Sequence, residues 1–247
     1  MIFTIAAKEL RSLFISPLAW VILGFLQLIM AWMFLSRLDA FLGVQSQLMA
    51  LPAPPGLTEV IVAPVFGATA LLLLLAVPLL SMRLMAEERR NQTISLLLSA
   101  PVSMTEIVLG KFLGLLLFLL LLVGLLGLMG ASLYAGGSLD LGLLLANLLG
   151  LALMAASFAA VGLFLSCLTQ QPVVAAIGGF GVLLGLWLVN MSTADPDSPL
   201  HLLSLLKHFE AFNKGLVDTA DLAYFLLLIA AFLALSIRRL DGDRLRG

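Results

Sequence analysis

Long apolar stretches separated by short polar connections dominate this chain of 247 residues. A helix that crosses a hydrocarbon core about 30 Å thick needs roughly 20 mainly apolar residues. Six stretches meet this requirement, and we expect an all-α membrane protein with six transmembrane helices. The predicted spans cover residues 17–36, 60–82, 107–134, 141–168, 172–191 and 222–237. The third and fourth exceed a minimal span, which predicts tilt or extension beyond the membrane.

A shorter pattern precedes the first span. Within residues 1–16, apolar side chains recur on one helical face, whereas Lys8 and Arg11 fall on the other. The apolar residues are Ile2, Ala6, Leu10, Leu13 and Phe14. This pattern predicts an amphipathic helix that lies flat on the membrane surface before Pro17 turns the chain inward.

Two connections between spans carry further patterns. Residues 83–105 form the only densely charged stretch between spans. Residues 192–221 open with a Pro/Asp/Ser turn cluster and continue with apolar residues at helical spacing, which predicts a short surface helix. We therefore divide the chain into a surface helix (1–16), a six-helix membrane domain (17–238) containing both connections, and a tail (239–247).

Composition supports a membrane location. Hydrophobic residues make up 62% of the chain and charged residues 11%, whereas a soluble domain carries roughly 25% charged residues. With the N-terminus inside, ten of the 13 Lys and Arg residues fall on the cytoplasmic side and three outside. This asymmetry predicts that both termini are cytoplasmic. We expect the chain to lie in the lipid bilayer and to bind no nucleic acid.

The predicted spans lack the residues that membrane chemistry requires. Their one basic group of note is Lys111, near the inner end of the third span. Ion-driven carriers and intramembrane proteases need ionisable groups near mid-membrane, so we expect no catalytic residue and an energy source in a partner. The single cysteine, Cys167, excludes an internal disulfide, and we expect no metal site. The mildly polar residues Gln27, Asn147, Ser157, Ser166 and Asn190 are expected to form hydrogen bonds between helices.

Two glycine pairs have the spacing that lets helices approach closely. Gly110 and Gly114 lie four residues apart in the third span, and Gly181 and Gly185 in the fifth. Such pairs are common in membrane helices. Packing within one subunit and packing between two copies are both compatible with each pair.

The sharpest motif is A-E-E-R-R-N-Q-T-I-S-L-L-L-S-A-P-V-S over residues 86–103. A charged cluster is followed by an apolar face made of Ile94, Leu97 and Leu98. A loop surrounded by water would not need such an apolar face. The face must therefore contact lipid, another part of the chain or a partner protein.

This motif, with E-I-V-L-G-K-F at 106–112, resembles the loop between the second and third spans of type-2 membrane domains of ABC transporters. The N-terminal helix ahead of Ser16 and Pro17 and the stretch 208–218 share the resemblance. The branch that the chain resembles most is the permease of gliding-motility-associated ABC systems. The resemblance implies a multi-pass protein of the bacterial inner (cytoplasmic) membrane, working as a dimer with two ATP-binding subunits.

In that family the loop supplies a coupling helix that sits in a cleft of the ATP-binding subunit. The resemblance implies polar docking contacts from Arg83, Glu87, Glu88, Arg89, Arg90, Gln92 and Thr93. It implies apolar anchors from Leu97, Leu98 and Pro101, and a second contact from Gln170 and Gln171. It also implies a dimer interface at Gly181 and Gly185. ATP and Mg would bind in the partner subunit, with no cofactor bound by this chain.

Three functional interpretations remain open at this stage. The chain is the membrane subunit of an ABC exporter, or a membrane anchor that recruits a cytosolic ATPase and transmits force to outer proteins. A secondary carrier or channel is the third, and the uncharged spans disfavour it.

Overall fold

The computed structural model describes residues 1–48, 56–93, 102–135, 140–192 and 203–244. These ranges are helical and contain no β-strand. The helices are α1 (Ile2–Ile15), α2 (Pro17–Leu48), α3 (Ala63–Ser81), α4 (Arg83–Arg90), α6 (Met104–Ser132), α7 (Leu141–Leu168), α8 (Pro172–Ser192), α9 (Leu205–Asn213) and α10 (Thr219–Arg244). A π-helical turn, Thr58–Val62, leads into α3, and a short 3-10 turn, Leu133–Ala135, follows α6.

Six apolar helices of spanning length are present among the described residues, which confirms the predicted number. They are α2, the joined pair α3 and α4, α6, α7, α8 and α10. The first is longer than predicted, because α2 continues to Leu48 instead of ending near residue 36. Arg37 and Asp39 are exposed on α2, so the charges end the most apolar stretch without ending the helix. The last span is also longer, since α10 extends to Arg244.

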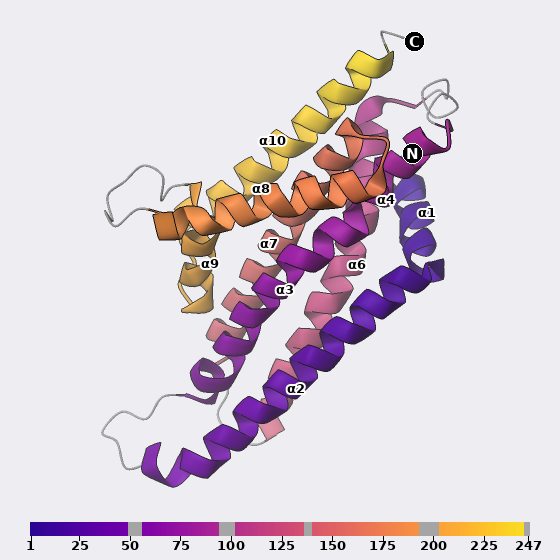
Figure 1. Cartoon of the computed structure of the whole chain (residues 1–247). Helices are drawn as coiled ribbons and strands as arrows, with labels where there is room; N and C mark the ends of the chain where they lie inside the picture. Colours follow the sequence, from indigo (N-terminus) through magenta and orange to yellow (C-terminus); the bar gives the residue numbers. More distant parts are fainter. Residues whose placement is uncertain (49–55, 94–101, 136–139, 193–202, 245–247) are drawn as a thin grey trace.

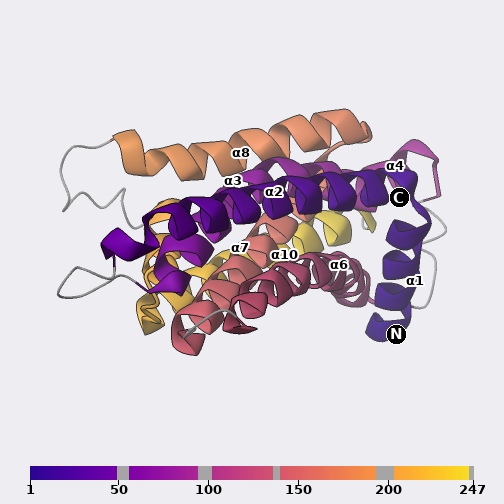
Figure 2. The same cartoon turned by 90° about the horizontal axis from the view of Figure 1, so that it is seen from below.

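Helix α7 occupies the centre of the bundle (Figures 1 and 2). It packs against α3, α6, α8, α9 and α10. Many of its buried residues are small, including Ala155, Ala159, Ala160 and Gly162. Lipid is as apolar as the side chains, so helices in a membrane are held together mainly by close van der Waals packing. Small residues allow this packing because they let the helix backbones approach closely.

Helix α9 confirms the helical pattern predicted within residues 192–221, and its apolar face is buried. Leu205, Phe209 and Phe212 are buried, and the helix packs on α7. At Gly150 of α7, an added Cβ would lie 2.6 Å from Phe212 Cβ. The glycine therefore makes room for the phenylalanine, and α9 covers one end of the central helix.

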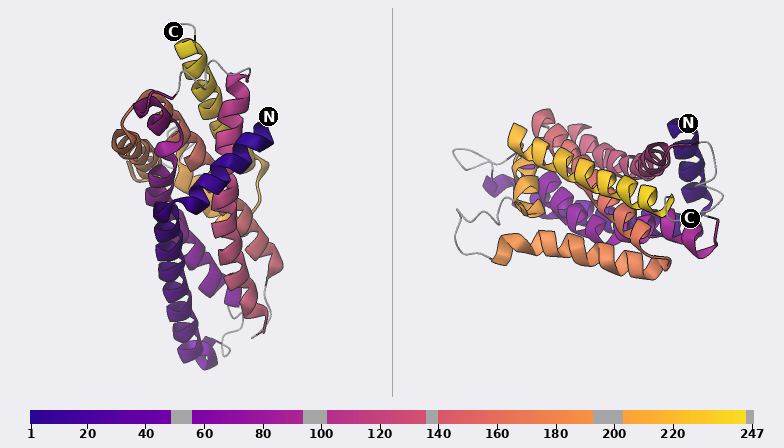
Figure 3. Two further views of the ribbon diagram at one scale, coloured as in Figure 1. Left: turned by 90° about the vertical axis from the view of Figure 1, so that its right-hand side faces the viewer. Right: turned by 90° about the horizontal axis from the view of Figure 1, so that it is seen from above.

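Helix α1 crosses the end of the bundle at a steep angle to α2 and α6 (Figures 2 and 3). The elbow between α1 and α2 is held at Trp20, whose indole Nε1 donates a hydrogen bond of 2.6 Å to the Phe14 carbonyl oxygen. The Phe14 ring also packs edge-on against Phe118 of α6. The predicted amphipathic helix is thus present, and its apolar face lies on α6.

The junction between α3 and α4 is held by α7. Ser166 Oγ accepts hydrogen bonds of 3.0 Å from the backbone N–H groups of Met85 and Ala86, and donates to the Met82 carbonyl oxygen. The first turn of a helix leaves N–H groups without helical partners, and Ser166 satisfies that of Met85 in α4. This is the interhelical role expected for Ser166 from the sequence.

Both chain termini lie at the same end of the bundle as α1 and α4 (Figures 1 and 3). The far end of α2 and helix α9 lie at the other end. The bundle therefore has one end that gathers the N-terminal helix, α4 and the last turns of α10.

Candidate functional site

The end of the bundle that carries α4 contains a buried ion cluster centred on Lys111. Lys111 Nζ lies 2.7 Å from Glu88 Oε1 of α4 and 2.9 Å from Glu9 Oε1 of α1. Its side chain is only 3% exposed. A lysine is tolerated at such a site only when carboxylates compensate its charge. The cluster therefore joins three helices, α1, α4 and α6, through one ammonium group.

The glycine pair of α6 creates the space in which Glu9 reaches Lys111. An added Cβ on Gly110 would lie 2.6 Å from Ile5 Cβ, and one on Gly114 would lie 2.7 Å from Glu9 Cβ. Helix α1 thus rests directly on the α6 backbone at both positions. Gly110 and Gly114 are used for packing within the subunit, one of the two alternatives that the sequence leaves open.

A capping box starts α6 just ahead of the cluster. Ser103 Oγ accepts a hydrogen bond from the Glu106 N–H, and Glu106 Oε2 accepts one from the Ser103 N–H. The reciprocal pair satisfies two N–H groups at the helix start. The Ser-x-x-Glu spacing at 103–106 is a recognised sequence signal for a helix start.

A second ion pair ties α4 to the C-terminal helix. The Arg89 guanidinium contacts the Asp243 carboxylate of α10, and Arg239 lies 3.5 Å from the same carboxylate. The Arg89 and Asp243 side chains are 12% and 18% exposed. Together with Lys111, this pair connects α4 with α1, α6 and α10.

The end of α4 has a defined direction. Gln92 adopts a left-handed backbone conformation, with φ of 57°. The Gln92 N–H bonds to the Arg89 carbonyl oxygen, and the Thr93 N–H bonds to the Glu88 carbonyl oxygen. Such bonds are typical of a helix C-terminus that ends in one left-handed residue. Helix α4 therefore ends in a hydrogen-bonded cap over residues 91–93.

The structure places the residues implied in docking into three groups. Glu88 and Arg89 turn inward to Lys111 and Asp243. Exposed side chains are those of Arg83, Glu87, Arg90, Gln92, Thr93, Gln170 and Gln171. Leu97, Leu98 and Pro101 lie outside the described residues.

The turn between α7 and α8 lies beside α4, as a shared docking face requires. A cavity of about 300 Å³ is lined by Arg83, Glu87 and Arg90 of α4 and by Pro172 and Val173 of α8. Gln170 and Gln171 directly precede these α8 residues. The structure thus brings the two implied contact segments to one end of the bundle.

The second glycine pair has a different environment from the first. Gly181 and Gly185 are exposed on α8, and no atom of the described residues lies within 4 Å of a Cβ built on either. Apolar side chains on the same helix are exposed as well, including Val174, Ile177 and Leu188. This face of α8 is left uncovered within one subunit.

Sequence reasoning missed the ion cluster, although a signal was present. Glu9 lies on the apolar stripe of α1, at the spacing Ile2, Ala6, Glu9, Leu13. A carboxylate in such a stripe indicates a buried partner. Asp243 carried no comparable signal, because several charges of both signs surround it in the sequence.

The fold and this site define a class of protein. It is a multi-pass helical membrane protein whose buried ion pairs gather at one end, around a short helix between two spans. A family model for the ABC-2 family transporter protein matches residues 3–243. The chain therefore belongs to the ABC-2 transporter family, as a membrane (permease) subunit. Membership implies an ATP-binding partner subunit. A search of curated proteins finds no significant match.

Proposed function

We propose that this chain is a permease subunit that couples ATP hydrolysis in a separate ATP-binding subunit to export or to conformational work across the membrane. The observation that supports this is the placement of α4. It lies at the start of segment 83–105, and buried ion pairs connect it to α1, α6 and α10. A force applied to the segment would therefore act on four helices together.

The coupling follows from rigid-body movement. When two ATP-binding subunits close on ATP, each moves the docking segment seated in it. The Lys111 cluster passes this movement to α1 and α6, and the Arg89–Asp243 pair passes it to α10. Breaking either connection inside a low-dielectric site leaves a charge without its partner, so the connected helices move as one unit.

We assign the direct contact with the ATP-binding subunit to the part of the segment beyond the inward pairs. Arg90, Gln92 and Thr93 provide polar contacts there, and Leu97, Leu98 and Pro101 provide apolar anchors. Gln170 and Gln171 form a second, smaller contact at the neighbouring turn. Glu88 and Arg89 hold the base of the segment. Arg83 and Glu87 lie closer to the spans, at the edge of this surface.

We further propose a homodimer that uses α8. The exposed pair Gly181 and Gly185 would allow close approach of a helix from a second copy. The exposed apolar face of α2, which includes Phe25 and Trp32, would extend the same contact. We also propose that the chain belongs to the gliding-motility-associated branch. It would lie in a bacterial inner membrane with both termini in the cytoplasm.

A second candidate function is a membrane anchor that transmits force to outer proteins without moving a substrate. It draws support from α9, at the end of the bundle opposite α4. The buried side of α9 packs on α7, whereas Lys207, Glu210 and Lys214 are exposed. A charged surface held on the central helix would suit an outer protein partner. A structure of the full complex, with either an open interior or an outer protein bound at α9, would separate the two functions.

The coupling proposal is tested by co-expression with an ATP-binding subunit, followed by co-purification and an ATPase assay. A triple variant, Arg90→Ala with Leu97→Ala and Leu98→Ala, removes the proposed contact. We expect it to retain its melting temperature but to bind the ATP-binding subunit about tenfold or more weakly. The matched control is Lys207→Ala with Glu210→Ala, at the opposite end. Recovery of a stable, ATP-hydrolysing complex from the triple variant would contradict the docking assignment.

A further inference from the structure

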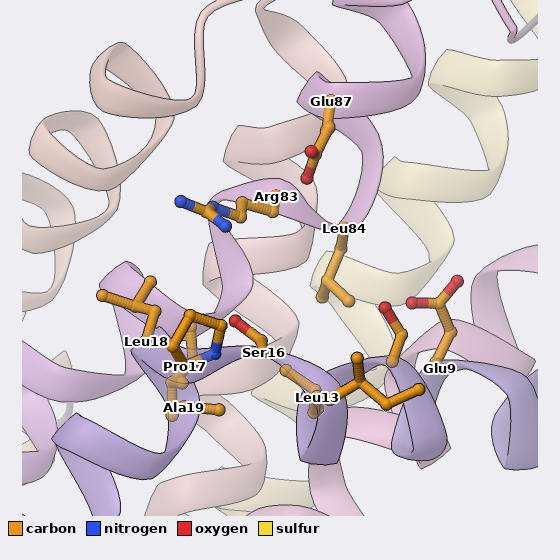
Figure 4. Close-up of a pocket in the computed structure, with 12 residues that line it drawn as sticks. Glu9, Leu13, Ser16, Pro17, Leu18, Ala19, Arg83, Leu84 and Glu87 are labelled. Carbon is orange, nitrogen blue, oxygen red and sulfur yellow. The ribbon is translucent and has the colours of Figure 1, made fainter.

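A cavity lies between the α1–α2 elbow and the α3–α4 junction. Its volume is about 360 Å³. Figure 4 shows Ser16, Pro17 and Leu18 on one side, with Arg83 and Glu87 reaching toward them from the other. Other lining residues are Glu9, Ser12, Leu13, Ile15, Ala19, Leu80 and Leu84. Glu9 also belongs to the ion cluster, and Arg83 and Glu87 lie at the edge of the proposed docking surface, but none of the contacts described above fills this space.

The cavity is located where the apolar spans begin. Pro17 is the first residue of the α2 span, and Leu18, Ala19 and Leu80 belong to apolar stretches of α2 and α3. On the other side, Arg83 and Glu87 belong to the polar helix α4. Trp20, one turn further along α2, is 54% exposed, as tryptophans at membrane interfaces are. The cavity therefore lies at the level of lipid headgroups, with an apolar floor facing the hydrocarbon.

The cavity presents one cation and one anion without partners. Arg83 and Glu87 are four residues apart on α4, both are exposed, and neither has an ion-pair partner within 4.0 Å among the described residues. Glu9 also lines the cavity, but its carboxylate is bound to Lys111. A ligand at this position would meet a guanidinium, a carboxylate and the hydroxyls of Ser12 and Ser16.

We propose that this cavity binds the headgroup of a phospholipid that carries both a phosphate and a primary ammonium, as phosphatidylethanolamine does. The Arg83 guanidinium binds the phosphate, since its planar fork matches phosphate oxygens. The Glu87 carboxylate accepts hydrogen bonds from the ammonium. The acyl chains run over Leu18 and Leu80 into the bilayer.

The lining favours this headgroup over a net anionic headgroup and over a soluble phosphate ester. A net anionic headgroup would satisfy Arg83 but would leave Glu87 beside a negative charge. A soluble phosphate ester would satisfy the polar wall but would leave the apolar floor uncovered, at a cost proportional to the area left in water. The zwitterionic lipid satisfies both charges and the floor.

Native mass spectrometry of the full-length purified protein, titrated with lipid, tests the proposal. The probes are short-chain phosphatidylethanolamine, short-chain phosphatidylglycerol and water-soluble glycerophosphoethanolamine. We expect phosphatidylethanolamine to bind about tenfold more tightly than either of the other two. We expect Arg83→Gln to weaken both lipids about tenfold, and Glu87→Gln to remove the preference for phosphatidylethanolamine. Arg83→Lys, which keeps the charge but not the fork, should fall between wild type and Arg83→Gln.

The matched control is Arg37→Gln, which removes an exposed arginine at the opposite end of α2. It should bind all three probes as the wild type does. Equal losses in the Arg83 and Arg37 variants would show non-specific lipid adhesion and overturn the proposal. Tighter binding of phosphatidylglycerol would overturn the ammonium assignment, and equal binding of glycerophosphoethanolamine would overturn the assignment to a membrane lipid. Circular dichroism melting of each variant confirms that the folded proteins are compared.

Discussion

Lys111 Nζ lies 2.7 Å from Glu88 Oε1, and this pair joins the start of α6 to α4, the helix that begins segment 83–105. Glu9 binds the same ammonium from α1 at 2.9 Å. The three residues come from segments that are separate in sequence, and Lys111 is almost fully shielded from water. The cluster thus connects α4, at the base of the proposed docking segment, to the N-terminal helix.

Replacing the lysine should destabilise the protein strongly. Lys111→Met leaves Glu9 and Glu88 facing each other without a compensating cation, and breaking a buried pair costs about 3–5 kcal/mol. The control is Lys8→Met, because the Lys8 side chain is 70% exposed and lies 4.0 Å from Glu9. The melting temperature of the purified protein in detergent measures the difference. If Lys111→Met has the same melting temperature as the Lys8→Met control, the Lys111 cluster does not stabilise the protein.

The two glycines of α6 that touch α1 should respond differently from a glycine further along the same helix. Gly114→Ala places a methyl group 2.7 Å from Glu9 Cβ, so α1 must shift, at a cost of about 1–3 kcal/mol. Gly124→Ala meets nothing within 4 Å and should be neutral, or stabilising by up to about 1 kcal/mol. Thermal melting and protease cleavage at Arg11 compare the two. If both variants melt alike, close packing of α1 on α6 is wrong.

The hydroxyl of Ser166 should matter more than that of Ser157 in the same helix. Ser166→Ala removes the acceptor for the Met85 N–H, which lies in the first turn of α4, and an unsatisfied buried donor costs about 1–3 kcal/mol. Ser157 Oγ bonds only to the Leu153 carbonyl oxygen of its own helix, so Ser157→Ala should be nearly neutral. Hydrogen exchange of the α4 amides should rise in the first variant and stay unchanged in the second. Unchanged exchange in both would count against Ser166 as the link between α4 and α7.

The proposed dimer contact at α8 can be tested by cross-linking. Gly181→Cys or Gly185→Cys should form a disulfide between two copies on oxidation in membranes, because two cysteines bridge only when their Cα atoms lie within about 7 Å. The native Cys167 is buried and should give no background. Ala223→Cys, exposed on α10, is the control. A dimer band from the control alone would move the interface away from α8.

The helices themselves were predictable from the sequence because hydropathy and helical period are local properties. The number of spans, the amphipathic N-terminal helix and the helix within 192–221 all followed from the order of apolar and polar residues. The length of α2 did not, since Arg37 and Asp39 reduce hydropathy without breaking a helix. The place where the apolar face of α9 is buried did not follow either, because Phe209 and Phe212 fit against Gly150 of a helix more than 50 residues away.

The sequence alone determined that the chain is a six-span membrane protein with most of its charges outside the predicted spans, since the length and apolarity of each segment decide its solvent. Only the tertiary structure decided what the charges and glycines do. Gly110/Gly114 and Gly181/Gly185 have the same spacing in the sequence. Helix α1 covers the first pair, whereas the second pair is exposed on α8. Lys111 can be buried because Glu88, 23 residues away, and Glu9, 102 residues away, meet it in space. The free energy of a buried charge depends on such partners, and no local pattern contains them.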